Sequence, residues 1–129
     1  MSPPRKIIAL VDDDASVRKA LERQLHAAGY RCVSFASGEE FLEIAATLGA
    51  ACLLADIHLD GMTGLELAVH PKVTNLALPV VLISGCNDPR FETPAREIGC
   101  AFLRKPVTSQ TLLETIVDTV GPPIADGDY

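Results

Sequence analysis

The sequence predicts a doubly wound α/β fold, with five parallel strands in one sheet and helices on both faces of that sheet. The chain has 129 residues, which is about the size of a single domain. Five apolar runs of strand length recur about 20 to 25 residues apart, and segments with helical periodicity separate them. Strands joined by helix-length crossovers run parallel, with right-handed connections.

The central strands are apolar at consecutive positions. Runs such as LLA and VVLI do not alternate with polar residues, as expected for strands that helices cover on both sides. We expect the strand order 2-1-3-4-5, which is common in this architecture. The predicted strands are residues 7–11, 31–35, 51–55, 79–83 and 101–104.

The first two helices carry clear end signals. Asp14 is the expected N-cap of the first helix, and Gly29 is its expected C′ residue. The second helix opens at Ser37, which has capping-box spacing to Glu40, and it ends before Gly49. The expected buried positions are Val17, Ala20, Leu21, Gln24, Leu25 and Ala28 in the first helix, and Phe41, Ala45 and Leu48 in the second.

Proline limits the third and fourth helices. A helix that starts near Gly64 should end by His70 because Pro71 follows, which leaves an irregular stretch before the next strand. The fourth helix should start only at Thr93 as the N-cap, with Pro94 in the first helical position.

The last helix begins near Thr108 and is followed by a proline-containing tail. We expect the folded domain to cover residues 6–120. Residues 121–129 include two prolines that cannot continue a helix, so they are expected to be a disordered end or the stub of a linker. The apolar stripe of the last helix is Leu112, Leu113, Ile116, Val117 and Val120.

Composition excludes several classes of function. The net charge of −6 and the pI near 4.9 argue against direct nucleic-acid binding, which needs a dense basic face. No apolar run approaches the roughly 18 to 20 residues that cross a bilayer, and the start lacks a signal-peptide pattern, so a cytoplasmic protein is expected. The scattered cysteines predict neither a zinc site nor a disulfide framework; they are Cys32, Cys52, Cys86 and Cys100.

Acidic residues collect where the predicted strands end. Asp12 and Asp13 follow the first strand, and Asp56 follows the third. Ser84 and Lys105 follow the fourth and fifth strands at the same edge, where open α/β sheets bind ligands. Adjacent strands lie about 4.8 Å apart, so the carboxylates should share one small cavity.

This constellation suits phosphoryl transfer. Clustered carboxylates raise one another's pKa, and a hard divalent cation held by oxygen ligands, best Mg²⁺, would resolve the conflict. Lys105 can neutralise a phosphoryl group as a point charge while a carboxylate oxygen of Asp56 attacks phosphorus. The Ser84 hydroxyl can donate to a phosphoryl oxygen, and Gly85 leaves the approach free of a side chain.

At these residues the sequence resembles the receiver domains of two-component response regulators. The segments GMTGLEL and AFLRKP are similar to receivers of the FixJ branch, and the resemblance covers about residues 6 to 120. The motifs that carry it are Asp12-Asp13, Asp56, Ser84-Gly85 and Lys105-Pro106.

The resemblance implies a flavodoxin-like fold and a phosphoacceptor rather than an enzyme with an external substrate. It implies that a sensor histidine kinase phosphorylates Asp56, and that Asp12, Asp13 and Asp56 hold Mg²⁺ with the backbone carbonyl of His58. It further implies a cis Lys105-Pro106 peptide, and a switch in which Ser84 moves toward the phosphate and Phe102 changes rotamer.

The same resemblance implies partners for the switch surface. These are an output domain or separate protein, and a homodimer through the fourth helix, fifth strand and fifth helix of the family fold. The family commonly has proline where Asp60 stands, so the loop after Asp56 carries an extra negative charge.

Three alternatives stay open from the residues. A haloacid-dehalogenase-type phosphatase places its nucleophile after the first strand, where Asp12-Asp13-Asp14 superficially fits, but the following residues do not continue that motif. A flavin-binding module has the same fold, although carboxylates at the first strand would repel a flavin phosphate. A pseudo-receiver that serves only as an interaction module is the third.

Overall fold

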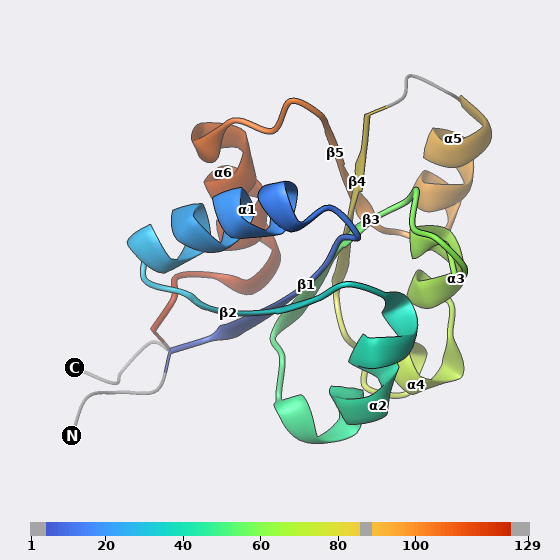
Figure 1. Cartoon of the computed structure of the whole chain (residues 1–129), viewed down its shortest axis with the longest axis horizontal. Helices are drawn as coiled ribbons and strands as arrows, with labels where there is room; N and C mark the ends of the chain where they lie inside the picture. Colours follow the sequence, from blue (N-terminus) through green and yellow to red (C-terminus); the bar gives the residue numbers. More distant parts are fainter. Residues whose placement is uncertain (1–4, 86–88, 125–129) are drawn as a thin grey trace.

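The computed structural model describes residues 5–85 and 89–124, and these form one sheet between two helical layers (Figure 1). All strand pairs are parallel and the order is β2-β1-β3-β4-β5, which confirms the predicted fold and strand order. The strands are β1 Ile7–Val11, β2 Arg31–Phe35, β3 Cys52–Asp56, β4 Val80–Ser84 and β5 Ala101–Arg104.

Two strands differ from the prediction by one residue at each end. Strands β3 and β4 each begin and end one residue later than expected, because pairing continues past the last apolar residue. Asp56 pairs with Ile83 of β4, and Ser84 pairs with Arg104 of β5. Asp56 and Ser84 are therefore the final residues of their strands, fixed by the sheet rather than carried on loops.

Within the described residues, six helices cover the two faces of the sheet. Helices α1 and α6 lie on one face, and α2, α3, α4 and α5 lie on the other (Figure 1). Their bounds are α1 Ala15–Ala27, α2 Gly38–Leu48, α3 Gly64–Ala68, α4 Pro71–Thr74, α5 Pro89–Glu97 and α6 Ser109–Val120.

Each face of the sheet buries its own apolar core. Successive strand residues point to opposite faces, so Leu10 and Leu54 pack against α1 and α6 while Ala9 and Leu53 face the other layer. Strands β3 and β4 are buried at every position, which explains their consecutive apolar residues.

The helix caps largely follow the expected residues. The Asp14 side chain accepts from the backbone N–H groups of Ser16 and Val17, which confirms it as the N-cap of α1. Ser37 caps α2 by accepting from Glu40 N. The Glu40 carboxylate accepts from Ala36 N rather than from Ser37 N, so the second hydrogen bond of a capping box is made by the residue before the cap. A complete capping box forms instead at the start of α3, between Thr63 and Glu66.

The proline-containing segments are more helical than predicted. The stretch after α3 was expected to be irregular, yet Pro71 begins α4, with His70 Nδ1 accepting from Lys72 N as the cap. Helix α5 begins at Pro89 rather than after Thr93, so Pro94 lies inside it. Proline fits the first helical position, and an internal proline removes only one backbone donor from a helix that tertiary packing supports.

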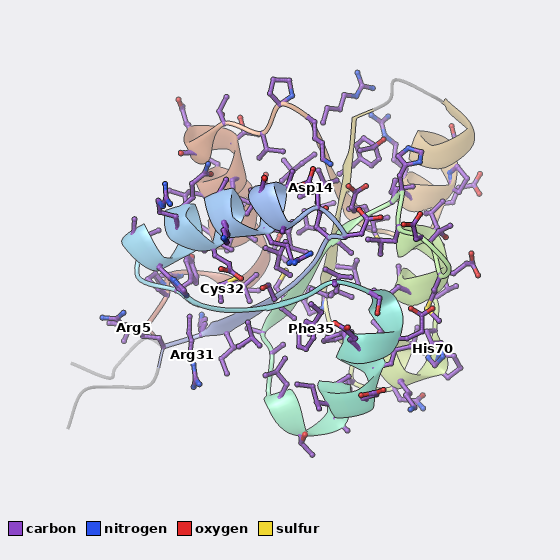
Figure 2. All side chains as sticks on the ribbon, in the orientation of Figure 1. Arg5, Asp14, Arg31, Cys32, Phe35 and His70 are labelled. Carbon is purple, nitrogen blue, oxygen red and sulfur yellow. The ribbon has the colours of Figure 1, made fainter. Side chains whose placement is uncertain are left out.

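Residues beyond the expected domain limit contact the domain. Lys6 N donates to Pro123 O at 2.7 Å, the Tyr30 hydroxyl donates to Gly121 O at 2.7 Å, and Arg5 forms an antiparallel bridge with Ile124. We call residues 121–124 the C-terminal strap. It crosses the amino ends of β1 and β2, where Arg5 and Arg31 lie (Figure 2).

The buried faces of α1 and α6 differ in detail from the predicted stripes. Ala20 of α1 and Val117 of α6 are exposed, whereas Leu21, Leu25, Leu112 and Ile116 are fully packed. Among the described residues, no helix has the length and apolar character that crossing a membrane requires.

Candidate functional site

The carboxyl edge of the sheet brings two buried carboxylates and one lysine together. Asp12 follows β1, Asp56 ends β3, and Lys105 follows β5. Lys105 Nζ lies 2.7 Å from Asp56 Oδ2 and 3.8 Å from Asp12 Oδ2. The strand order predicts this meeting, because β3 lies next to β1 and Lys105 reaches across β4. The ammonium group therefore compensates part of the negative charge of both carboxylates.

Asp12 is almost completely buried. Only 1% of the surface of this residue is exposed, and Asp12 Oδ1 accepts a hydrogen bond from Asp14 N at 2.9 Å. Its Oδ2 is buried without a hydrogen-bond partner. Burial raises the pKa of Asp12, and the charge of Asp56 adds to this, while the hydrogen bond from Asp14 N and the charge of Lys105 oppose it. Asp12 thus offers a desolvated oxygen that a cation could bind.

Asp56 is held by a hydrogen bond at each carboxylate oxygen. His58 N donates to Oδ1 at 2.8 Å, and Lys105 donates to Oδ2. The backbone of Asp56 packs directly against the start of α3, since a Cβ at Gly64 would lie 2.5 Å from Asp56 O. Only glycine permits this close approach, which fixes the loop that follows β3.

Lys105 is anchored at its backbone and partly open at its head. Lys105 N donates to Ser84 O at 2.8 Å, and the peptide to Pro106 is cis, as the resemblance implied. Burial acts to lower the pKa of Lys105, but its hydrogen bond with Asp56 and the charges of Asp56 and Asp12 outweigh burial and raise that pKa. A Cβ at Gly85 would make an ordinary contact with the Lys105 stem at 3.6 Å.

Asp13 does not join the buried pair in this arrangement. Its side chain is exposed, and its Oδ2 accepts from Asp60 N at 3.3 Å. The described residues contain no group of three Asp, Glu, His or Cys side chains close enough to hold a metal ion. The physical reason is that the Lys105 ammonium lies between Asp12 and Asp56, whereas Asp13 is engaged by the loop after β3.

The two expected switch residues lie on neighbouring strands. Ser84 is fully buried, and its Oγ lies 3.5 Å from Nε2 of His58. Phe102 in β5 is half-buried and packs against the core under α2 to α5. Cys86, which follows Ser84 and Gly85, lies outside the described residues.

Sequence reasoning missed two contributors to the site. Arg18 Nη1 donates to the backbone oxygen of Asp12 at 2.6 Å, which links α1 to the acidic turn. The sequence feature that could have revealed this contact is the position of Arg18, one helical turn after the Asp14 cap. The contact between His58 and Ser84 was also missed, because nothing in the spacing shows which way a loop side chain points.

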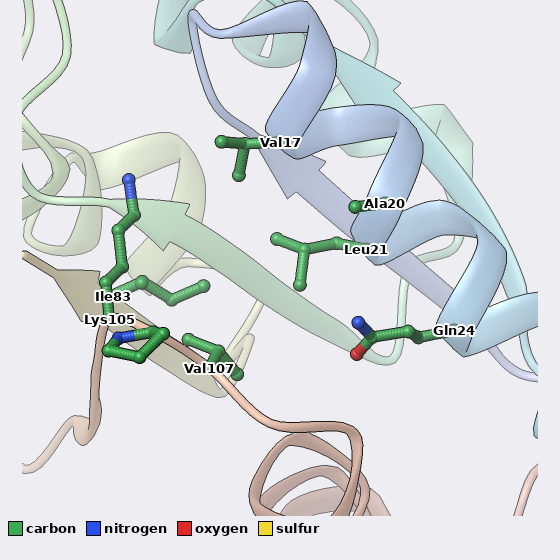
Figure 3. Close-up of a pocket in the computed structure, with 8 residues that line it drawn as sticks. Val17, Ala20, Leu21, Gln24, Ile83, Lys105 and Val107 are labelled. Carbon is green, nitrogen blue, oxygen red and sulfur yellow. The ribbon is translucent and has the colours of Figure 1, made fainter.

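A groove of about 200 Å³ opens beside Lys105, between α1 and the segment after β5 (Figure 3). It is mainly apolar, and the Oε1 atom of Gln24 is buried there without a hydrogen-bond partner. Its walls include Val17, Leu21 and Gln24 of α1, together with Ile83, Pro106 and Val107.

Comparisons with known proteins point to one family. The family model of the response regulator receiver domain matches residues 8–117 of this chain. The chain is 31% identical to nodulation protein W of Bradyrhizobium diazoefficiens, over 88% of this chain and 50% of that protein. It is 39% identical to the DNA-binding transcriptional regulator NtrC of Escherichia coli, over 79% of this chain and 22% of that protein.

Solved structures show the same likeness. Full-length FixJ from B. japonicum superposes with a TM-score of 0.83 and 27% identity, covering 91% of this chain and 58% of that chain. The response regulator StyR superposes with a TM-score of 0.81 and 32% identity, covering 90% and 59%. The chain spans about half the length of nodulation protein W and less of NtrC.

Proposed function

Because this chain belongs to the receiver domains of two-component response regulators, we propose that Asp56 is its phosphoacceptor. The observation that carries the proposal is the 2.7 Å contact between Asp56 Oδ2 and Lys105 Nζ, beside the buried carboxylate of Asp12. Lys105 lies closer to Asp56 than to Asp12, at 2.7 Å against 3.8 Å, which favours Asp56 over the phosphatase alternative with its nucleophile after β1.

The proposed step moves one phosphoryl group from nitrogen to oxygen. A carboxylate oxygen of Asp56 forms a bond to phosphorus while the bond between phosphorus and the histidine nitrogen of the kinase breaks. The electron pair of that bond returns to the imidazole nitrogen, and the product is an aspartyl phosphate. Lys105 neutralises the phosphoryl oxygens during the transfer, and the Ser84 hydroxyl donates to one of them afterwards.

We assign Mg²⁺ binding to Asp12, Asp13, Asp56 and the backbone carbonyl of His58. The unpartnered Oδ2 of Asp12 and the all-oxygen donor set fit a hard cation. Bound there, the ion would supply charge neutralisation for the transferring group. The side chains of Lys105 and Asp13 must then change position. Lys105 contacts Asp56 in this structure, and the Asp13 carboxylate accepts from Asp60 N.

The function of the domain is signalling, and its partners follow from that role. Response regulators work with histidine kinases and output domains, so we propose that a sensor histidine kinase in the cytoplasm phosphorylates this chain. We further propose that an output domain or protein reads the surface of α5, β5 and α6, through which two copies can also pair. On this surface Arg104 and Val117 are exposed.

The test is acyl-phosphate formation with acetyl phosphate and Mg²⁺, followed by intact-protein mass spectrometry. The wild-type chain should gain one phosphoryl group, and hydroxylamine should remove it because acyl phosphates are labile to that nucleophile. Asp56→Asn should gain none, with Asp118→Asn as a matched carboxylate control on the exposed side of α6. Stoichiometric labelling of Asp56→Asn would contradict the proposal, and multiple turnover lost on changing Asp12 alone would favour the phosphatase.

A further inference from the structure

His58 contacts both of the residues that the proposed function couples. Its backbone N–H donates to Asp56 Oδ1 at 2.8 Å, and its ring Nε2 lies 3.5 Å from Ser84 Oγ. One residue therefore contacts the phosphoacceptor through its backbone and the switch hydroxyl through its side chain. This arrangement follows from the register of the sheet, since Asp56 pairs with the residue before Ser84.

The loop that carries His58 is fixed on both sides. Ile57 is fully buried, and its N–H donates to the carbonyl of Ile83 at 2.9 Å. Beyond His58, Leu59 is buried and Asp60 N donates to an Asp13 carboxylate oxygen. The alternation of buried and exposed positions leaves the His58 side chain at the rim of the site, where it meets Ser84.

The Ser84 hydroxyl must exchange partners inside the protein. Ser84 has no exposed surface, so bulk water does not solvate its Oγ. A phosphoryl group on Asp56 would bring charged acceptor oxygens, and hydrogen bonds to such oxygens are roughly twice as strong as bonds between neutral groups. Any interaction that holds the hydroxyl elsewhere before phosphorylation opposes this exchange.

We propose that His58 is a positioning residue that restrains the Ser84 hydroxyl until a phosphoryl group on Asp56 draws it away. The proposal rests on the proposed function and adds a regulatory contact to that same site. Losing the imidazole contact should make the phosphorylated conformation easier to reach. The gain should exist only while Ser84 carries its hydroxyl.

The test is a double-mutant cycle that uses beryllofluoride, which mimics a phosphoryl group on aspartate. Binding in the presence of Mg²⁺ is followed by amide chemical shifts in the wild type, His58→Ala, Ser84→Ala and the double variant. His58→Ala keeps the backbone N–H to Asp56 and removes the imidazole ring that lies beside Ser84 Oγ. It should lower the beryllofluoride concentration for half-saturation by about threefold, the value of a modest hydrogen bond.

In the Ser84→Ala background the His58→Ala change should have no effect on that concentration. His58→Gln, which keeps a polar side chain able to reach a hydroxyl, should stay nearer the wild type than His58→Ala. The matched control is His26→Ala, which removes an imidazole that accepts from Cys32 N, away from the site. It should leave beryllofluoride binding unchanged.

Two results would overturn the restraint. One is an equal effect of His58→Ala in both Ser84 backgrounds, and the other is unchanged or weaker beryllofluoride binding by His58→Ala alone. Failure of the phosphoacceptor assignment looks different, because the wild type itself would then bind no beryllofluoride at Asp56. That result would remove both proposals together.

Discussion

The two ends of the sheet are held by different kinds of interaction. At the carboxyl end, buried Asp12 and Asp56 meet Lys105, and two of these groups have raised pKa values. At the amino end, the C-terminal strap is joined to the sheet by backbone hydrogen bonds and by the Tyr30 hydroxyl. The carboxyl end brings the charged groups of the proposed site together. The amino end joins the C-terminal strap to the residues that precede β1 and β2.

This difference indicates that chemistry and stability are largely separable along the strands. Changes at the carboxyl end should alter phosphorylation more than folding, because Asp56 and Lys105, the proposed phosphoacceptor and its neutralising cation, lie there. Changes at the amino end should alter folding and leave phosphorylation intact. Two substitutions test this separation, and a third measures how the buried charge at the carboxyl end affects stability. They are given from the largest expected effect to the smallest.

Lys105→Met should slow acyl-phosphate formation by about a hundredfold, the usual cost of losing one electrostatic stabiliser of a transferring group. Methionine keeps the length of the stem but cannot neutralise the phosphoryl oxygens. The measurement is the rate of labelling by acetyl phosphate. Lys19→Met on the exposed side of α1 is the control and should label at the wild-type rate. A loss of less than about threefold would mean that Lys105 does not act on the phosphoryl group.

Tyr30→Phe should lower the free energy of unfolding by about 1 kcal/mol, because it removes the hydrogen bond to Gly121 O. Tyr30 is 1% exposed, so its hydroxyl exchanges water for Gly121 O when the chain folds. Urea denaturation measures the change. The labelling rate of this variant should match the wild type, and a parallel fall in that rate would break the proposed separation of the two ends.

Asp12→Asn should give the smallest effect, a pH-dependent gain in stability. Burial raises the pKa of Asp12 above its ordinary value of 3.8, so the folded state holds its proton to higher pH than the unfolded state does. Wild-type stability therefore falls as pH rises from that value through the folded pKa. Asparagine removes this cost, so the variant should be the more stable protein near neutral pH in Mg²⁺-free buffer. The gain in stability should shrink on acidification. A gain that is independent of pH would contradict the raised pKa of Asp12.

The fold was predictable because each strand and most helices carry local signals. The consecutive apolar residues of β3 and β4 indicate central strands, and the Asp14 and Ser37 caps mark where α1 and α2 begin. The helices with proline were less predictable. His70 as a cap for Pro71, and Pro94 inside α5, depend on tertiary contacts that support helices with weak intrinsic propensity.

For the site, the sequence was enough to predict that Asp12, Asp56 and Lys105 lie close together. Strand order brings Asp12, Asp56 and Lys105 to one edge, and the distances confirm that juxtaposition. The orientation of Asp13 toward Asp60, and of His58 toward Ser84, could not be predicted. Side-chain direction in a loop is set by which neighbours are buried, and the sequence alone does not fix those contacts.

The bridge between Arg5 and Ile124 has a practical consequence for engineering. These two residues are neighbours in space at the edge of the molecule opposite Asp12 and Asp56. Fluorescent reporters attached through them would stand side by side, well clear of Asp56. The same proximity favours grafting this domain into a surface loop of a host protein, since a host loop need open only slightly to admit it.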